Sequence, residues 1–164
     1  MTYQWWVFLH IAGVFAFLMF HGVSVVVAFR VRRERDPARI MSLLELSASA
    51  LAGMYAGLLI LLGGGIVAGF LGPDQQLGGL SWWGSGWIWT ALAALVVTMG
   101  VMYAVATNYY KRLRTIAGAM AEGSHAVSEG ELAAVLGGPR PWILAIVGFG
   151  SLLFILYLMM FKPF

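Results

Sequence analysis

Four long apolar stretches limit the fold of this chain more than any other feature. They comprise about residues 5–29, 41–70, 87–110 and 142–161. Each is long enough to cross a bilayer, because the hydrocarbon core is about 30 Å thick and a spanning helix needs about 20 apolar residues. With 61% hydrophobic and 10% charged residues, the chain does not have the composition of a water-facing globule. The sequence therefore predicts an all-α, polytopic integral membrane protein. We expect a single domain, residues 1–164, in which four transmembrane helices form an antiparallel bundle.

The basic residues indicate the orientation of this bundle. Nine of the ten lie in the connections that follow the first and third spans: Arg30, Arg32, Arg33, Arg35, Arg39, Lys111, Arg112, Arg114 and Arg140. Only Lys162 lies on the opposite side. Cytoplasmic loops retain Lys and Arg, so we expect both termini outside the cytoplasm. The pI is basic, about 9.5, but residues placed at helix ends are expected to meet the lipid bilayer and not nucleic acid.

Two short patterns predict where helices start. Asp36 precedes Pro37, and proline is favoured in the first turn of a helix. Ser128 stands three residues before Glu131, the spacing of a capping box. This second pattern predicts a short amphipathic helix on the inner membrane surface, within the connection formed by residues 111–141.

The second span is rich in small residues at helical spacing. Ser49, Gly53 and Gly57 are four residues apart, and Gly63–Gly65 and Gly69 follow them. Small residues let two helix backbones approach closely. We interpret them as packing positions within the bundle. A flat surface for a planar cofactor or for a partner subunit is the alternative.

Most of the tryptophans are expected at the outer membrane interface, beside an irregular glycine-rich connection over residues 71–86. Six of the seven belong to this group: Trp5, Trp6, Trp82, Trp83, Trp87 and Trp89. Indole prefers the boundary between lipid and water, so anchoring explains the group. A quinone, pigment or partner site is the alternative.

Two histidines inside the first span carry the clearest functional signal. His10 and His21 are eleven residues apart, which returns the side chain to within about 20° of the same helix face. Tyr3, Phe17 and Ser24 fall on that face too, so we expect it to point into the bundle. Counting residues from each membrane face places five residues of the other spans at about the same membrane depth as His21: Met54, Tyr55, Met102, Tyr103 and Ser151. An ionisable residue at membrane depth is a functional hypothesis, and a histidine that only hydrogen-bonds a neighbouring helix is the alternative.

Three chemistries are open to these histidines. Haem b needs an axial imidazole and an apolar slot, and His10 or His21 would supply the imidazole. A second ligand within the chain would have to be a methionine such as Met54 or Met102, with Met99 a further possibility. Copper(I) favours the same imidazole and thioether donors. A proton relay from Glu45 to His21 is the third chemistry, although we expect Glu45 to form an interfacial ion pair with Arg39 or Arg112.

Several segments together resemble an uncharacterised family of small bacterial integral membrane proteins. They are Leu9-His10-Ile11, His21-Gly22-Val23-Ser24, the arginine-rich run from Ala28 to Arg39, the tryptophan-rich run from Trp82 to Trp89, and the terminal Phe161-Lys162-Pro163-Phe164. The resemblance implies a four-span topology in the bacterial inner (cytoplasmic) membrane. More distantly, the chain is similar to the copper resistance protein D membrane domain and to HemJ-type protoporphyrinogen oxidases. The latter likeness implies haem on His10.

These observations leave two classes of function. The first, which we favour on sequence alone, is an accessory subunit that docks on partner subunits of a larger respiratory or photosynthetic electron-transfer complex. The second is a haem b-binding redox protein that uses His10 and His21, with copper handling as a further alternative. A b561-type cytochrome is disfavoured, because it would need paired histidines on several helices.

Overall fold

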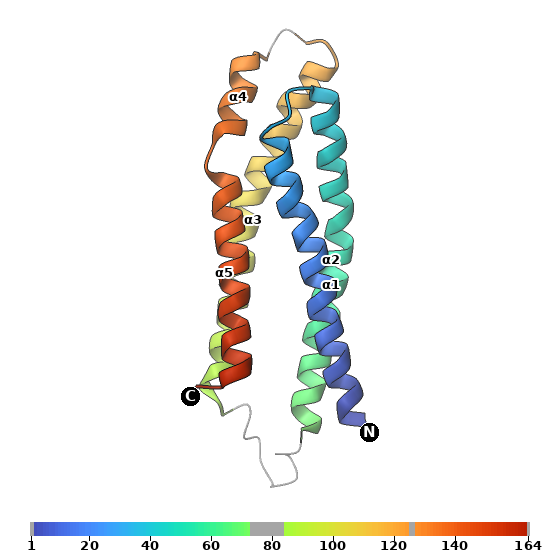
Figure 1. The fold of residues 1–164 in the computed structure, drawn as a ribbon, viewed down its shortest axis with the longest axis vertical. Helices are drawn as coiled ribbons and strands as arrows, with labels where there is room; N and C mark the ends of the chain where they lie inside the picture. The colour runs from blue at the N-terminus through green and yellow to red at the C-terminus, as the bar shows by residue number, and fades with distance from the viewer. Residues whose placement is uncertain (1, 73–83, 125–126, 164) are drawn as a thin grey trace.

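The computed structural model describes residues 2–72, 84–124 and 127–163, and it is all-helical. Its helices are α1 (Thr2–Val31), α2 (Pro37–Leu71), α3 (Gly86–Ala121), α4 (Glu129–Gly137) and α5 (Arg140–Phe161). Four of them lie side by side along the long axis of the molecule, and both termini lie at one end (Figure 1). Four helical segments are long and apolar enough to cross a membrane, with α4 and α5 counted together in the last. The predicted number and class of helices are thus confirmed.

Both predicted helix starts are confirmed. Asp36 caps α2, and its carboxylate accepts the Ala38 N–H at 3.0 Å, with Pro37 in the first turn. Ser128 caps α4, and its hydroxyl oxygen accepts the Glu131 N–H at 3.2 Å. Satisfying an orphan amide in this way stabilises a helix by about 1 kcal/mol. The Glu131 side chain does not complete the capping box, because it pairs instead with Arg112.

Helix α3 continues past the predicted end of its span at Tyr110, so the expectation that residues 111–121 belong to a loop is wrong. Leu113, Ile116 and Ala117 in this extension are buried, and they pack in one hydrophobic cluster with Leu132 and neighbouring residues of α4. Tertiary packing therefore extends the helix where composition alone indicated a connection. Helix α4 covers the end of the molecule by this contact.

The glycines of α2 are packing positions against α1. A Cβ at Gly57 would lie 2.6 Å from the backbone nitrogen of Phe17, and one at Gly64 would lie 2.7 Å from that of His10. From the other side, a Cβ at Gly13 would meet the backbone of Leu61. The two helices therefore approach too closely for any larger residue, which supports the packing interpretation. We call this contact the glycine seam.

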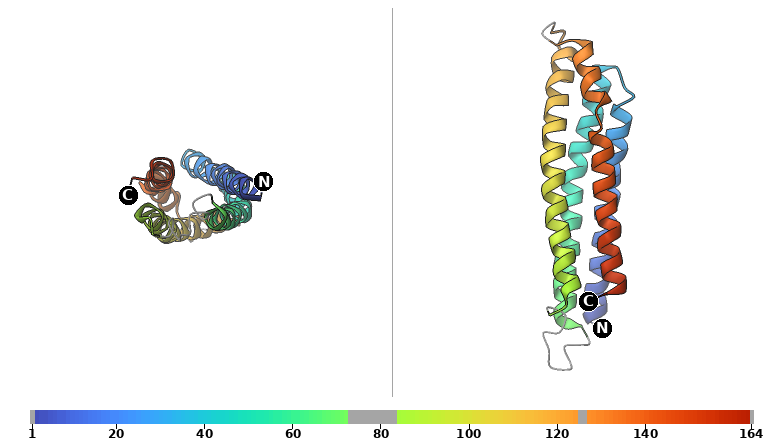
Figure 2. Two further views of the ribbon diagram at one scale, coloured as in Figure 1. Left: turned by 90° about the horizontal axis from the view of Figure 1, so that it is seen from below. Right: turned by 90° about the vertical axis from the view of Figure 1, so that its left-hand side faces the viewer.

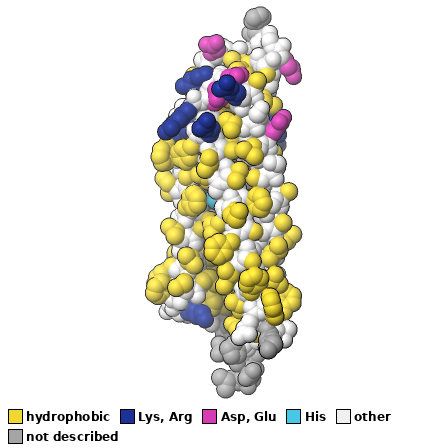
Figure 3. All heavy atoms as spheres, turned by 45° about the vertical axis from the view of Figure 1, so that its right-hand side comes forward, with side chains coloured by type: hydrophobic (Ala, Val, Ile, Leu, Met, Phe, Trp, Pro, Cys, Tyr) yellow, Lys and Arg dark blue, Asp and Glu magenta, His cyan; other side chains and the backbone are white. Residues whose placement is uncertain are grey.

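The arrangement of the four long helices is uneven. Helices α1 and α2 pack closely along the seam, α3 packs on α5, and contacts between α1 and α5 are few. Viewed from below, the ribbons of the long helices are arranged in a ring (Figure 2). On the face drawn in Figure 3, charged side chains gather mainly at one end and hydrophobic side chains cover the middle. We call the end with Arg30–Arg39 and residues 111–140 the basic end.

Of the tryptophans expected at the outer interface, the structure describes Trp5 and Trp6 near the start of α1 and Trp87 and Trp89 in the first turn of α3. Trp5 and Trp89 are exposed, and the Lys162 Nζ lies 5.8 Å from the centre of the Trp87 ring. Trp82 and Trp83 lie outside the described residues, as does most of the predicted irregular connection.

Candidate functional site

One cavity of about 720 Å³ lies between the four long helices. Its lining comes from α1, α2, α3 and α5, and it extends from Leu95 to Thr115 along α3. At a rise of 1.5 Å per residue, the 20 steps from Leu95 to Thr115 span about 30 Å. We call it the central cavity. Its size falls within the range of about 300–1,000 Å³ that is usual for small-molecule sites.

His21 lines this cavity from α1 and is 5% exposed. Its ring stacks on Phe17, with ring centres 6.0 Å apart and planes 4° apart, and it meets the edge of Phe149 at 5.5 Å. Nε2 is buried and has no hydrogen-bond partner. A buried polar atom without a partner costs about 1–3 kcal/mol. The ring is therefore held by aromatic contacts while one nitrogen is left unused.

Gly148 of α5 is the neighbour of that nitrogen. A Cβ at position 148 would lie 2.6 Å from His21 Nε2 and 3.6 Å from the terminal methyl of Met102. The missing side chain thus makes room for the imidazole between α1 and α5. The sequence offered no signal for this role, because Gly148 is one of many glycines in an apolar span and its partner lies 127 residues away in the chain.

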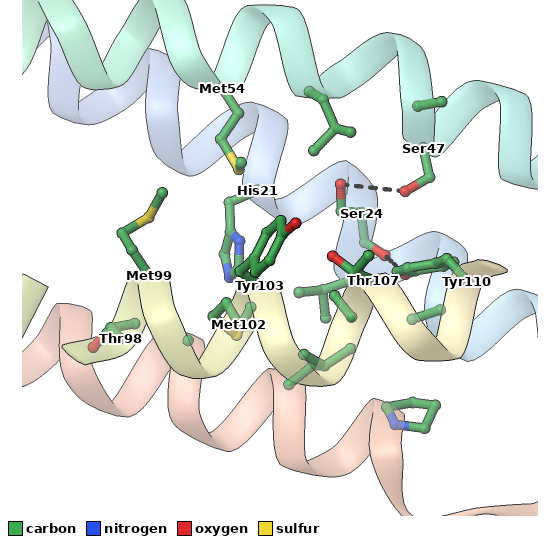
Figure 4. A pocket seen from close by; sticks show the side chains of 18 of the residues that line it. His21, Ser24, Ser47, Met54, Thr98, Met99, Met102, Tyr103, Thr107 and Tyr110 are labelled. Carbon is green, nitrogen blue, oxygen red and sulfur yellow. Dashed lines mark hydrogen bonds between the residues drawn. The ribbon is translucent and has the colours of Figure 1, made fainter. Parts of the chain in front are cut away.

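Three methionines surround the His21 side chain. Met54 projects from α2, and Met99 and Met102 project from α3, all lining the central cavity (Figure 4). The residues that depth counting placed level with His21 line this same cavity: Met54, Tyr55, Met102, Tyr103 and Ser151. The structure therefore brings together one imidazole and three thioethers from three helices.

A set of hydroxyl groups lines the cavity between His21 and the basic end. The Ser47 hydroxyl donates to the Ser24 hydroxyl at 3.4 Å, and the Tyr110 hydroxyl donates to the Ser24 carbonyl at 3.5 Å. Thr98 and Thr107 also line the cavity, although the Thr98 hydroxyl donates to the Ala94 carbonyl of its own helix. These groups give an otherwise apolar cavity several hydrogen-bonding atoms.

His10 has a different environment from His21. Its Nδ1 lies 2.6 Å from the carbonyl oxygen of Leu61, so the ring N–H donates to the backbone of α2. The same ring packs on Gly65, and His10 is absent from the lining of the central cavity. Of the predicted stripe, Phe17 and His21 are buried, whereas Tyr3 at the start of α1 is exposed. His10 thus contacts α2 and lies outside the central cavity, so the structure separates the two histidines.

The ion pairs expected for Glu45 are not formed. Arg39 pairs with Asp36 at 3.4 Å, and Arg112 pairs with Glu131 at 3.4 Å. Arg39 is thus paired with a residue close to it in sequence, and Arg112 is paired with a residue of α4. Glu45 is exposed and does not line the central cavity. The proposed relay from Glu45 to His21 therefore has no geometric support among the described residues.

Outside the spans, the carboxylate of Glu34 accepts the backbone N–H groups of Arg35 and Asp36, at 2.9 and 3.2 Å. These hydrogen bonds favour the ionised form and hold the pKa of Glu34 below its ordinary value. The turn between α1 and α2 is thereby closed by one of its own side chains.

Comparisons with protein-family models, with curated proteins and with solved structures found no match.

Proposed function

We propose that this chain is an integral protein of the bacterial inner membrane, with its four spans in an antiparallel bundle and both termini outside, that binds haem b in the central cavity through His21. The observation that supports this proposal most strongly is the His21 imidazole, which is buried at the level of the cavity and keeps an unpartnered Nε2. Ligation would give that nitrogen the partner that it lacks among the described residues.

The donor set and the size of the cavity fit such a group. Histidine and methionine are both axial ligands of haem iron, and Met54, Met99 and Met102 line the same cavity as His21. Nε2 lies against Gly148, so ligation by this atom would require the ring to move off α5 or α5 to move away from α1. The sparse contact between α1 and α5 favours such a displacement.

Bound haem would supply one-electron redox chemistry. The residues of the chain would hold and shield it. Phe17 would support the imidazole by ring stacking from its own helix, apolar side chains would exclude water, and the Ser24 and Tyr110 hydroxyls would offer hydrogen bonds at the cavity wall. His10, which the resemblance to HemJ-type proteins implied as the haem ligand, does not line the central cavity and is not part of this proposal.

The grouping of one imidazole with three thioethers also favours copper(I) as a second candidate, because soft donors select this ion. Binding of Cu(I) in competition with a chromogenic chelator, measured on the wild-type protein and on a Met54→Leu/Met99→Leu/Met102→Leu variant, tests this alternative. Loss of competition in the triple variant would support copper handling. Equal behaviour of the two proteins would exclude the methionines as its ligands.

An accessory role in a larger electron-transfer complex stays a prediction. Four of the glycines that might have served as a docking surface, Gly53, Gly57, Gly64 and Gly65, face α1 across the seam instead. The proposal of a cofactor site therefore has the more specific support.

The first test is an absorption spectrum of the protein purified in mild detergent from its native membrane, oxidised and then reduced with dithionite. We expect a b-type spectrum with one haem per chain. A colourless protein that also fails to bind added haem would refute the proposal, and a stable partner in the same preparation would then support the accessory role.

A further inference from the structure

The two ends of the central cavity differ in charge. Lys111 and Arg114 line it where α3 reaches the basic end, whereas His21 and Met102 line it deeper between the helices. Met102 and Lys111 are nine residues apart on one helix, a distance of about 14 Å along the axis. Both cations are exposed at the cavity mouth.

Neither cation has a carboxylate partner among the described residues. The ion pairs at this end of the molecule join Arg112 to Glu131 and Arg39 to Asp36. The lining of the cavity contains no Asp or Glu within the described ranges. Arg112, one residue from Lys111, thus has a partner on α4, while its two neighbours on the cavity side have none.

The cavity also reaches the surface between α2 and α3. Leu51 and Tyr55 of α2 and Tyr103 of α3 belong to its lining, and Tyr55 and Tyr103 are 48% and 71% exposed. These residues lie at the depth of the apolar spans, so a molecule dissolved in lipid would meet this opening directly. An apolar body can thus enter from the side while a charged group stays at the basic end.

We propose that Lys111 and Arg114 form an anion-binding mouth that holds the acid group of a membrane amphiphile, whose apolar body lies in the central cavity toward His21. This inference rests on the proposed function only in treating the cavity as a ligand site. The acid group is either the carboxylates of a porphyrin or the phosphate of a phospholipid. Arg and Lys bind both kinds of oxyanion through charge-assisted hydrogen bonds.

The test compares ligands that differ only in charge. Metal-free protoporphyrin IX and its dimethyl ester are titrated into the purified protein and followed by fluorescence, so that axial ligation contributes to neither affinity. In parallel, native mass spectrometry measures retention of phosphatidylglycerol against phosphatidylcholine with the same acyl chains. The proteins are the wild type, the double variant Lys111→Gln/Arg114→Gln, and the control Arg112→Gln.

We expect the double variant to weaken binding of the diacid or retention of phosphatidylglycerol by about tenfold, the effect of about 1.4 kcal/mol from two partly exposed ion pairs. Binding of the ester should be unaffected, and retention of phosphatidylcholine, whose phosphate is already neutralised by the ammonium group of its own headgroup, should fall less than that of phosphatidylglycerol. The Arg112→Gln control should stay within about twofold of the wild type, and Lys111→Arg/Arg114→Lys should restore binding. Added salt should weaken only the charged ligands.

The two arms identify the source of the acid group. Preference for the diacid indicates a porphyrin, and preference for phosphatidylglycerol alone indicates a lipid. An ester bound as tightly as the diacid, together with equal retention of the two lipids, would overturn the anion-binding mouth. If the protein prefers the charged ligands but binds haem no more tightly than metal-free protoporphyrin, the anion-binding mouth is supported and ligation of haem by His21 is refuted.

Discussion

The glycine seam gives a sharp prediction, because two neighbouring glycines of α2 differ completely in their surroundings. A Cβ at Gly64 would lie 2.7 Å from the His10 nitrogen, whereas a Cβ at Gly63 would meet nothing within 4 Å. The Gly64→Ala change therefore pushes two helix backbones apart, since the clash is with main-chain atoms that cannot rotate away. Ordinary van der Waals contact begins at 3.4 Å, which is 0.7 Å farther than 2.7 Å.

Overpacking of this kind costs about 1–3 kcal/mol, and it also stretches the hydrogen bond from His10 to Leu61. The control Gly63→Ala should be neutral, or stabilising by up to about 1 kcal/mol, because alanine is the better helix former. Reversible unfolding in mixed micelles, followed by circular dichroism, measures both free energies. A Gly64→Ala protein as stable as Gly63→Ala would refute the close approach of α1 and α2.

Two further predictions concern the basic end of the molecule. The Ser128→Ala change should remove the hydrogen bond that caps α4 at the Glu131 N–H, at a cost of about 1 kcal/mol. Amide hydrogen exchange should therefore become faster within residues 129–137 and not in α3. Unchanged exchange in α4 would contradict the cap. Because the pKa of Glu34 is lowered by folding, its stabilising effect is complete above its unfolded pKa, about 4.3, and is lost as pH falls through the lower folded value. Carbon-13 NMR titration of the Glu34 carboxyl should give a midpoint below this unfolded value, and a midpoint at or above it would exclude the two backbone hydrogen bonds.

The number of helices and the start of α2 could be predicted from sequence because each depends on a local signal. Apolar length marks a spanning helix, and Asp36-Pro37 marks its first turn. The end of α3 could not be predicted in the same way. Residues 111–121 carry enough charge to suggest a loop, and only the contact of Leu113 and Ile116 with α4 explains their helical structure.

The two histidines show the same limit at the site. Helical spacing placed His10 and His21 within about 20° of each other, and depth counting placed His21 level with Met54 and Met102. Spacing alone could not separate their roles, because these depend on what the neighbouring helices present. Helix α2 presents the Leu61 carbonyl to His10, while α5 presents a bare glycine to His21. For the same reason, the sequence alone explains Lys111 and Arg114 by membrane topology, and only the structure shows that they line the cavity.

The most direct test of the account is a haem titration of the His21→Ala protein beside the His10→Ala protein, with both compared to the wild type. The two changes remove the same side chain from one helix, and unfolding measurements establish that both variants are folded. We predict that His21→Ala abolishes the low-spin b-type spectrum and that His10→Ala retains it. Loss of the spectrum in His10→Ala, with His21→Ala unaffected, would contradict the assignment of the central cavity as the haem site.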